Sequence, residues 1–245
     1  ILPKACALLR CSETTLMCGR YALYGPVSRL RERFSANIDE LAADFGPRYN
    51  VAPMQLLPVV RQRPSGERVV HLLRWGLIPG WAKDETIATR LINARGETLA
   101  EKPAFRTAYR SRRCIVPASG FYEWKAIPGG KQPYYIQPAN DELFGFAGLW
   151  ERWSSPAGTP IDPFTVVTTE ANESMRALHE RMPVILQPGD DNLWLSRDTT
   201  PERFGQLIAP CPDAMLCMHP VSKAVGNARN EGPQLIDASS DPQSQ

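Results

Sequence analysis

The sequence lacks the features that would place it in several large classes of protein. No apolar run among its 245 residues approaches the roughly 18 that a transmembrane helix needs, so we expect no membrane-spanning segment. Lysine and arginine together number 28 against 26 acidic residues, which leaves a formal net charge of only +2. Such a balance gives no strong field over the whole molecule, so any attraction to nucleic acid must come from local clusters of charge.

Histidine is scarce, and the cysteines lack the spacing of common metal sites. The chain has three histidines and six cysteines, and no two of the cysteines form a Cys-x-x-Cys pair. Cys211, Cys217 and His219 lie close in sequence, but no fourth ligand matches them, so we expect no metal. The uneven cysteine spacing argues against a disulfide framework and indicates free thiols in a reducing cytoplasm.

Proline is abundant, with 23 residues, which favours short strands and fixed turns over long helices. The hydrophobic pattern predicts helices over 27–34, 38–45, 170–179 and 201–208, and another that starts at 93–99. It predicts a hairpin over 55–63 and 68–74, and strands over 113–116, 120–125, 133–137, 143–150, 163–168, 193–195 and 215–219. Together these segments predict an α+β fold: a single domain with a curved, mainly antiparallel, barrel-like sheet and flanking short helices.

The two ends of the chain differ from the middle. Residues 1–16 begin without methionine, and their apolar stretch is too short for a signal peptide. They are either a poorly ordered tail or a leader ahead of a true start at Met17, and we favour the leader because a start at Met17 would put Cys18 at the N-terminus. The polar residues from Glu231 onward predict a disordered tail. We therefore expect a leader over 1–17, one domain over 18–230 and a tail over 231–245.

Cys18 offers the most reactive chemistry in the sequence, provided that it is the first residue. A methionine before a small residue is normally trimmed, so a chain started at Met17 would begin with an amine and a thiol on adjacent carbons. Their ordinary pKa values of about 7.7–8.0 and about 8.5 leave a fraction of each nucleophilic at neutral pH. The amine can form a Schiff base with an aldehyde, and the thiol can then close a thiazolidine ring. The alternative is that Cys18 is a small buried apolar residue.

Three other polar residues suit a site built around Cys18, and each also has an ordinary structural interpretation. Asn93 stands at what reads as a helix start, where it could be only an N-cap. Glu123 lies among aromatic residues, where desolvation would raise its pKa and suit it to proton transfer, although on an alternating strand it could face water. His179 stands at a helix end, where it could be only a solvated terminus.

Candidate DNA contacts include a cluster of basic residues and aromatic side chains. The densest basic cluster comprises Arg106, Arg110, Arg112 and Arg113, which could bind phosphates with a steep salt dependence or form a solvated charged surface. Bases of a single strand could stack on tryptophan and tyrosine side chains.

Seven segments, in this order, resemble the SRAP family of abasic-site processing proteins: MCGRYALY, RYNVAP, RWGLIPGWAKD, LINARGET, GFYEWK, TTEAN and HERMPVIL. The match runs from Cys18 to about Asn227. The resemblance implies a protein of the DNA-damage (SOS) response that binds single-stranded DNA and crosslinks to its abasic sites as a thiazolidine. It implies no cofactor and places the protein in the cytoplasm, at the bacterial nucleoid when DNA is damaged. We take a monomer as the default.

The resemblance also assigns roles by position. Cys18 matches the nucleophile, Asn93 the residue that positions the reacting sugar, Glu123 the acid/base, and His179 the residue that assists Schiff-base chemistry and reversal. The matched DNA contacts are Arg20, Trp75, Trp81, Arg95 and Arg181, to which the basic cluster adds Arg106.

Two other functions remain open at this point. Family members remove their own leading residues to expose the cysteine, and a thiol peptidase acting on proteins could use Cys18 and His179 as nucleophile and base. A module that reads modified or single-stranded DNA without chemistry is the third possibility. The crosslinking function requires that residues 1–17 be absent, because an amide on Cys18 cannot form a Schiff base.

Overall fold

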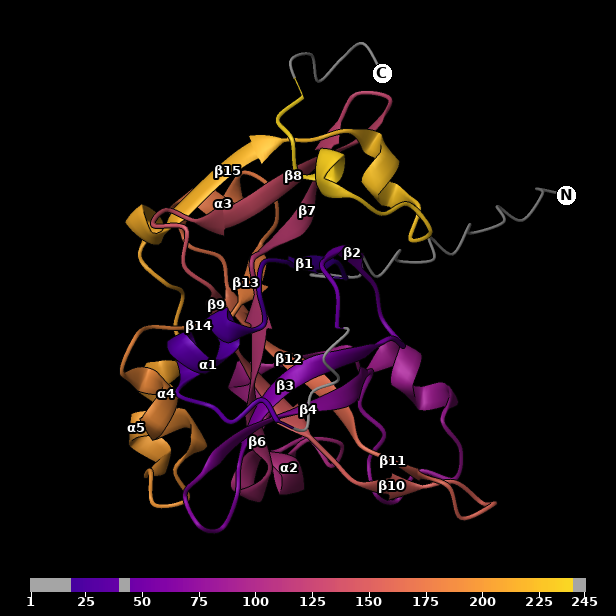
Figure 1. The fold of residues 1–245 in the computed structure, drawn as a ribbon, viewed down its shortest axis with the longest axis vertical. Coiled ribbons are helices and arrows are strands. Elements are labelled where there is room, and N and C mark those ends of the chain that lie inside the picture. The colour runs from indigo at the N-terminus through magenta and orange to yellow at the C-terminus, as the bar shows by residue number, and fades with distance from the viewer. Residues whose placement is uncertain (1–18, 40–44, 240–245) are drawn as a thin grey trace, which may run out of the picture.

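A computed structural model describes residues 19–39 and 45–239 of the chain (Figure 1). The predicted nucleophile Cys18 and the predicted leader lie outside the described residues, as do residues 40–44 and 240–245. The roles predicted for Cys18 and for residues 1–17 therefore stay predictions.

Five strands close into a barrel. Strand β12 (Pro163–Glu170) pairs with both β4 (Arg68–Trp75) and β9 (Phe144–Trp150), and β3 (Leu56–Gln62) and β6 (Arg113–Ala118) complete the ring. Only the β12–β4 pair of this ring is parallel. The β3–β4 hairpin turns at Gly66, whose φ of +89° suits a residue without a Cβ. The predicted curved, mainly antiparallel, barrel-like sheet is confirmed.

A second sheet covers one end of the barrel, in the upper part of Figure 1. Its order is β15 (Leu216–Pro220), β8 (Gly130–Pro138), β7 (Gly120–Ile127), β1 (Tyr21–Leu23) and β2 (Arg48–Val51). Short strands extend the barrel: β5 (Asn93–Arg95) and β13 (Arg181–Pro183) pair with β12, and β14 (Ile185–Leu186) pairs with β9. Strands β10 (Trp153–Ser154) and β11 (Pro160–Ile161) form a separate hairpin.

The helices are short, as the proline content predicts. They are α1 (Ser28–Phe34), α2 (Arg106–Ser111), α3 (Glu173–Arg176), α4 (Asp190–Leu195) and α5 (Pro201–Leu207), with 3₁₀ turns η1 (Thr86–Arg90), η2 (Gly96–Thr98), η3 (Asp213–Met215), η4 (Lys223–Gly226) and η5 (Pro233–Leu235). The helices predicted over 27–34 and 201–208 are confirmed. The strand predicted over 193–195 is wrong, because those residues end α4. Nowhere in the described residues is a helix both long and apolar enough to cross a membrane.

The predicted disordered tail is wrong for residues 231–239. The backbone N–H of Tyr49 donates to Glu231 Oε2 at 2.9 Å, and Val221 bridges to Ala238. Leu235 is 1% exposed. The polar composition of this segment misleads because a single buried leucine and hydrogen bonds to the second sheet are enough to hold it.

Candidate functional site

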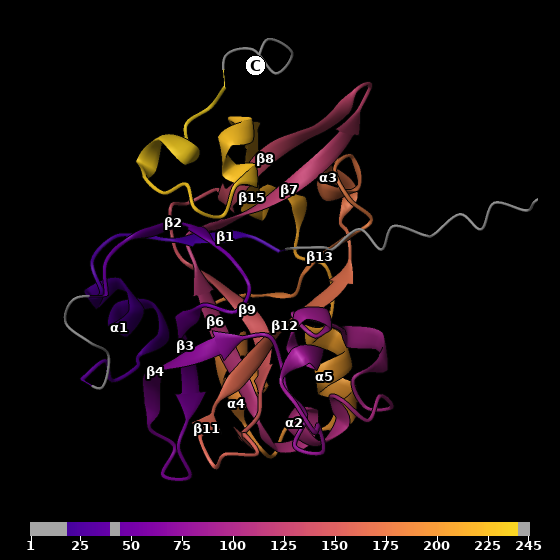
Figure 2. The same ribbon diagram turned by 90° about the vertical axis from the view of Figure 1, so that its right-hand side faces the viewer.

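A pocket of about 850 Å³ lies where the second sheet meets the barrel. Three parts of the chain form its walls: η1 with β5, the β7–β8 hairpin, and the turn from α3 into β13. In Figure 2 the β7–β8 hairpin lies above β13, and β12 lies below β13. The lining residues are Thr89, Arg90, Ile92, Asn93, Arg95, Trp124, Ala126, Lys131, Thr168, Leu178, His179, Glu180 and Arg181. Four of the predicted site residues, Asn93, Arg95, His179 and Arg181, are thus brought together.

Asn93 lies in a strand, so the predicted helix start is wrong. It is the first residue of β5 and aligns with Val166 of the parallel strand β12. The carbonyl of Ile92 accepts hydrogen bonds from Val166 N at 3.1 Å and from Trp75 Nε1 at 2.9 Å. Pairing with a barrel strand thereby overrides the tendency of asparagine to cap a helix, and it directs Asn93 to the pocket.

His179 is held in one orientation by the backbone around it. Asn172 caps α3 through a 2.9 Å hydrogen bond from Met175 N, and His179 N donates to Met175 O at 2.9 Å. The backbone N–H of Arg181 donates to His179 Nδ1 at 3.0 Å. In the neutral ring the proton therefore lies on Nε2. Burial lowers the pKa of His179, so the neutral ring predominates at physiological pH.

Glu123 is 3% exposed, so the alternative that it faces water is wrong. Strand β1 aligns Tyr21 with Phe121, and Tyr122 N donates to Arg20 O at 3.0 Å. Continued by two residues from the Tyr21–Phe121 pair, this antiparallel register places Gly19 opposite Glu123. A Cβ built on Gly19 would lie 3.9 Å from Cδ1 of Ile92, a pocket residue. The residue that follows Cys18 is therefore next to both Glu123 and the pocket.

Arg181 lines the pocket, but its guanidinium is already bound within the protein. Its Nη1 and Nη2 donate to the two carboxylate oxygens of Glu97 at 2.7 and 2.9 Å, and Nη2 also donates to Thr168 O at 2.9 Å. The Arg181 side chain is 13% exposed. These contacts fix β13 to the end of β12, and through the backbone N–H of Arg181 they also fix the ring of His179.

Arg20 is likewise bound within the protein. Its Nη1 donates to Asn50 Oδ1 at 2.8 Å and to Val225 O at 2.7 Å. Asn50 is fully buried, and its Nδ2 donates to Asn227 O and Asn230 O, both at 3.0 Å. Together the two side chains hold the 225–230 segment against β1 and β2. The signal for Asn50 was available in the sequence, because an asparagine inside the strand-like stretch RYNVAP calls for polar partners.

The two tryptophans predicted to contact DNA have different environments. Trp75 is fully buried and stacks on Phe164 with ring centroids 6.3 Å apart, so the prediction that its ring contacts DNA is wrong. Its indole instead supports Ile92 in the pocket wall. Trp81 is 61% exposed, which leaves its ring accessible to a base, but it does not line the pocket.

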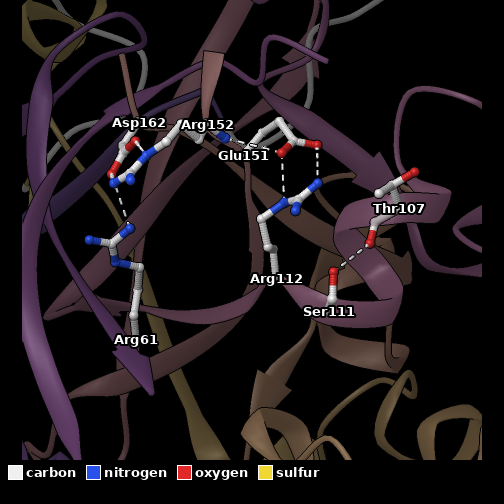
Figure 3. A network of polar contacts seen from close by, with 7 residues as sticks. All are labelled: Arg61, Thr107, Ser111, Arg112, Glu151, Arg152 and Asp162. Atoms are coloured by element: carbon white, nitrogen blue, oxygen red, sulfur yellow. Dashed lines mark hydrogen bonds and ion pairs between the residues drawn. The ribbon is translucent and has the colours of Figure 1, made fainter. Parts of the chain in front are cut away.

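Two of the four arginines in the predicted basic cluster serve the fold. Arg113 is buried and donates to the carbonyls of Trp194 at 2.6 Å and Ser196 at 2.5 Å, and burial lowers its pKa to about 10. Arg112 forms a 2.6 Å ion pair with buried Glu151 (Figure 3). Arg106 is exposed on α2, outside the pocket, and its predicted DNA contact stays a prediction.

The cysteines that the structure describes, Cys114, Cys211 and Cys217, are free. Burial raises the pKa of the Cys114 thiol, and that of Cys211 to about 12, so both are poor nucleophiles. Among residues 19–39 and 45–239, no three His, Cys, Asp or Glu side chains gather closely enough to hold a metal ion.

Pocket residues that the sequence did not single out include Arg90, Trp124 and Lys131. Trp124 adjoins Glu123 in the motif GFYEWK, and the alternation of a strand separates the two onto opposite faces. Arg90 and Lys131 are single basic residues in otherwise ordinary segments, so only the tertiary structure shows that they share a pocket.

The chain is similar in sequence to several known proteins. Abasic site processing protein YoqW of Bacillus subtilis (strain 168) is 42% identical over 226 residues, which cover 91% of this chain and 100% of that protein. Abasic site processing protein HMCES of Gallus gallus is 33% identical over 263 residues, covering 90% of this chain and 77% of that protein.

Solved structures share the fold. A protein from Bacteroides thetaiotaomicron superposes with a TM-score of 0.82 at 24% identity, covering 91% of this chain and 100% of that one. A protein from Bordetella bronchiseptica gives a TM-score of 0.70 at 30% identity, covering 84% of this chain and 100% of that one. The family model described as SOS response associated peptidase (SRAP) matches residues 17–228, and the chain belongs to this family.

Proposed function

We propose that this protein processes abasic sites in DNA by forming a covalent thiazolidine between Cys18 and the aldehyde of the abasic sugar in a single strand. One observation carries the proposal: Gly19 lies beside Ile92 of the pocket, and the register of β1 against β7, extended beyond its Tyr21–Phe121 pair, brings it opposite buried Glu123. Asn93 and His179 line that same pocket. The names of the relatives, abasic site processing proteins, supply the substrate.

The chemistry needs no redox partner. The neutral amine of Cys18 adds to the C1′ aldehyde, and loss of water gives a Schiff base. The thiolate then attacks the imine carbon, forming a C–S bond, and the nitrogen takes a proton as the five-membered ring closes. A free amine is essential, so the reactive form begins at Cys18 and lacks residues 1–17.

Residues in the pocket, and Glu123 beside it, have roles that fit these steps. Glu123, buried beside Gly19, would move protons between the amine and the departing water. His179, with its proton on Nε2, would donate a hydrogen bond to the oxygen that leaves. Asn93 would orient the sugar, as its place at the pocket edge of β5 permits.

The test compares two forms of the chain with an oligonucleotide that carries one abasic site. The form beginning at Cys18 should give a band that survives heat and detergent, while the form that retains residues 1–17 should give none unless those residues are cut off. Cys18→Ala in the first form should abolish the band. A band from Cys18→Ala equal to that of the unmutated form would overturn the proposal.

The same samples separate the alternatives. Equal non-covalent binding by the unmutated form and by Cys18→Ala, with no covalent band from either, would indicate a reader of DNA without chemistry. Cleavage of unrelated peptides by the form beginning at Cys18, again with no band, would indicate a thiol peptidase. Loss of residues 1–17 from purified protein but not from its Cys18→Ala variant, seen by mass spectrometry, would support self-processing.

A further inference from the structure

The pocket carries an excess of positive charge that the described part of the chain does not neutralise. Four cationic side chains line it, Arg90, Arg95, Lys131 and Arg181, against a single carboxylate, Glu180. Arg181 is neutralised by Glu97 from outside the pocket lining. The other three cations are exposed, and none of their side chains has a hydrogen bond or an ion pair in the part of the chain that the structure describes.

This situation contrasts with that of several arginines elsewhere in the described part of the chain. Ion pairs with carboxylates engage Arg33, Arg61, Arg74, Arg112 and Arg152, among others. Cations gathered on one pocket without carboxylate partners repel one another, and an anionic ligand relieves that repulsion. The pocket therefore suits a ligand with more than one negative charge.

Lys131 is aimed into the pocket by the geometry of the β7–β8 hairpin. The hairpin turns through Gly129, with φ of +84°, and pairs Ala126 directly with Lys131. Directly paired residues lie on the same face of a sheet, and so do residues two apart on one strand. Trp124, Ala126 and Lys131 accordingly share one face, and all three line the pocket. The charge of Lys131 also contributes to lowering the pKa of His179, which places it within electrostatic reach of the reaction centre.

Arg90 belongs to a different wall. It ends η1, whose Ala88 is buried, and two residues later the chain enters Ile92 and then β5. This attachment holds Arg90 at the pocket edge on the β5 side, whereas Lys131 stands on the hairpin of the second sheet. The two cations thus come from two separate walls around the position where the sugar would react.

We propose that Arg90 and Lys131 bind the backbone phosphates of the DNA strand on either side of the abasic nucleotide, so that the strand crosses the pocket from η1 to the β7–β8 hairpin. This inference rests on the proposed function and specifies the path of its substrate. It assigns the strand to the pocket cations rather than to the arginines of α2. Trp124 and Leu178 supply the apolar surface on which a neighbouring sugar or base would lie.

The test is non-covalent binding of a fluorescein-labelled 15-nucleotide oligothymidine, without an abasic site, to the full chain as a function of salt. For a single strand the slope of log K against log salt changes by about 0.7 for each phosphate contact. Arg90→Gln with Lys131→Gln should make the slope shallower by about 1.4. At 0.1 M salt this corresponds to about 25-fold weaker binding, taking the electrostatic contribution to vanish near 1 M.

The matched control removes two positive charges elsewhere. Arg31 and Arg63 form ion pairs with Asp39 and Glu67 outside the pocket, and Arg31→Gln with Arg63→Gln should leave the slope unchanged within about 0.3. Thermal unfolding followed by circular dichroism checks that both double variants are folded. If the pocket variant does not fold, Arg90→Glu and Lys131→Glu as single variants replace it, with the same expected direction.

Crosslinking of an abasic oligonucleotide at saturating protein distinguishes failure of this inference from failure of the proposed function. An unmutated protein that binds and crosslinks, with a double pocket variant that keeps the full salt slope, would overturn this inference and leave the proposed function intact. An unmutated protein that neither binds the oligonucleotide nor crosslinks an abasic one would overturn both. Weaker binding by the pocket variant together with normal crosslinking at saturation supports both.

Discussion

Two regions of the molecule are rich in charged side chains, and they differ in whether carboxylates neutralise the cations. Near β3, β9, β11 and α2, carboxylates neutralise the arginines: Asp162 accepts from Arg61 at 3.1 Å and from Arg152 at 3.0 Å (Figure 3). At the pocket, Arg90, Arg95 and Lys131 have no carboxylate partner within the described residues.

The difference separates charge that holds the fold from charge that is free to bind. In the paired region Arg61 also lies over the ring of Trp150, 4.3 Å from its centroid, and burial of Asp162 is outweighed by the two guanidiniums, which lower its pKa. Removing one partner there strands the others in a partly buried setting. At the pocket edge a cation can be removed without leaving a hydrogen-bonded or ion-paired partner unpaired, so its loss should affect ligand binding much more than stability.

The two tryptophans of the WGLIPGW segment, Trp75 and Trp81, show the same division between a residue that holds the fold and a residue that is accessible to a ligand. Trp75→Ala gives the largest effect on stability that we expect. The substitution leaves a cavity beside Phe164 and removes one of the two hydrogen bonds to the Ile92 carbonyl, and should cost about 3–5 kcal/mol of unfolding free energy. Trp81→Ala should change stability by less than about 0.5 kcal/mol but weaken single-strand binding by about 1–3 kcal/mol if a base stacks there. Urea unfolding and oligothymidine titration measure the two quantities. An unstable Trp81→Ala or a stable Trp75→Ala would contradict the assignment.

Asp162→Asn removes the carboxylate charge that Arg61 and Arg152 share in the paired region. The Asp162 side chain is 20% exposed and the Arg61 side chain 12%. The free energy of unfolding should therefore fall by about 2 kcal/mol, which is less than the roughly 3–5 kcal/mol expected when a fully buried ion pair is broken. Affinity for the single strand should not change. Chemical denaturation gives the first value, with Glu67→Gln, which removes an exposed carboxylate at the tip of the β3–β4 hairpin, as control. A loss of stability no greater than that of the control would show that the network is not structural.

Glu97→Gln would remove the carboxylate that neutralises Arg181, so that Arg181 would resemble the unpaired cations of the pocket. Stability should fall by about 1 kcal/mol, because the bidentate contact is only partly exposed. The salt slope of single-strand binding should become steeper by up to about 0.7, because the freed guanidinium can reach a phosphate. An unchanged slope with reduced stability would mean that Arg181 only positions β13 and His179.

The smallest effect concerns His179 and pH. Because burial lowers its pKa in the folded state, the unfolded chain binds a proton on His179 that the folded protein does not, in the window from the ordinary value of 6.5 down to the folded value. Stability should therefore fall as pH falls through that window. Glu180, Arg181 and Lys131 are the charged groups that act on the ring. In urea unfolding between pH 5 and 8, His179→Gln should flatten this part of the profile, and an unchanged profile would contradict the burial of the neutral ring.

Much of the fold was predictable from the sequence because its signals are local. Alternation and the turn at Pro64-Ser65-Gly66 fixed the β3–β4 hairpin, and the apolar spacing of Leu30 and Phe34 fixed α1. The predictions failed where tertiary pairing decided the outcome. Asn93 became a strand residue through β12, and the short apolar run at 193–195 suits a strand or a helix equally until α4 packs beside β6.

The site was predictable residue by residue only where the family resemblance supplied it. Asn93, Arg95, His179 and Arg181 do share the pocket. Sequence could not reveal that Arg20 and Arg181 are committed to protein partners, that Trp75 is buried, or that Arg90 and Lys131 face one pocket from separate walls. Those properties depend on which residues meet across the two sheets.

The most direct test of the central claim is to map the adduct. The form beginning at Cys18 is incubated with abasic single-stranded DNA without borohydride, digested with trypsin and nuclease, and examined by mass spectrometry. The account predicts the sugar remnant on the peptide Cys18-Gly19-Arg20, because a thiazolidine is stable without reduction. A remnant found only after borohydride treatment, and on Lys131 of the pocket, would contradict it, because a lysine amine can form only the Schiff base.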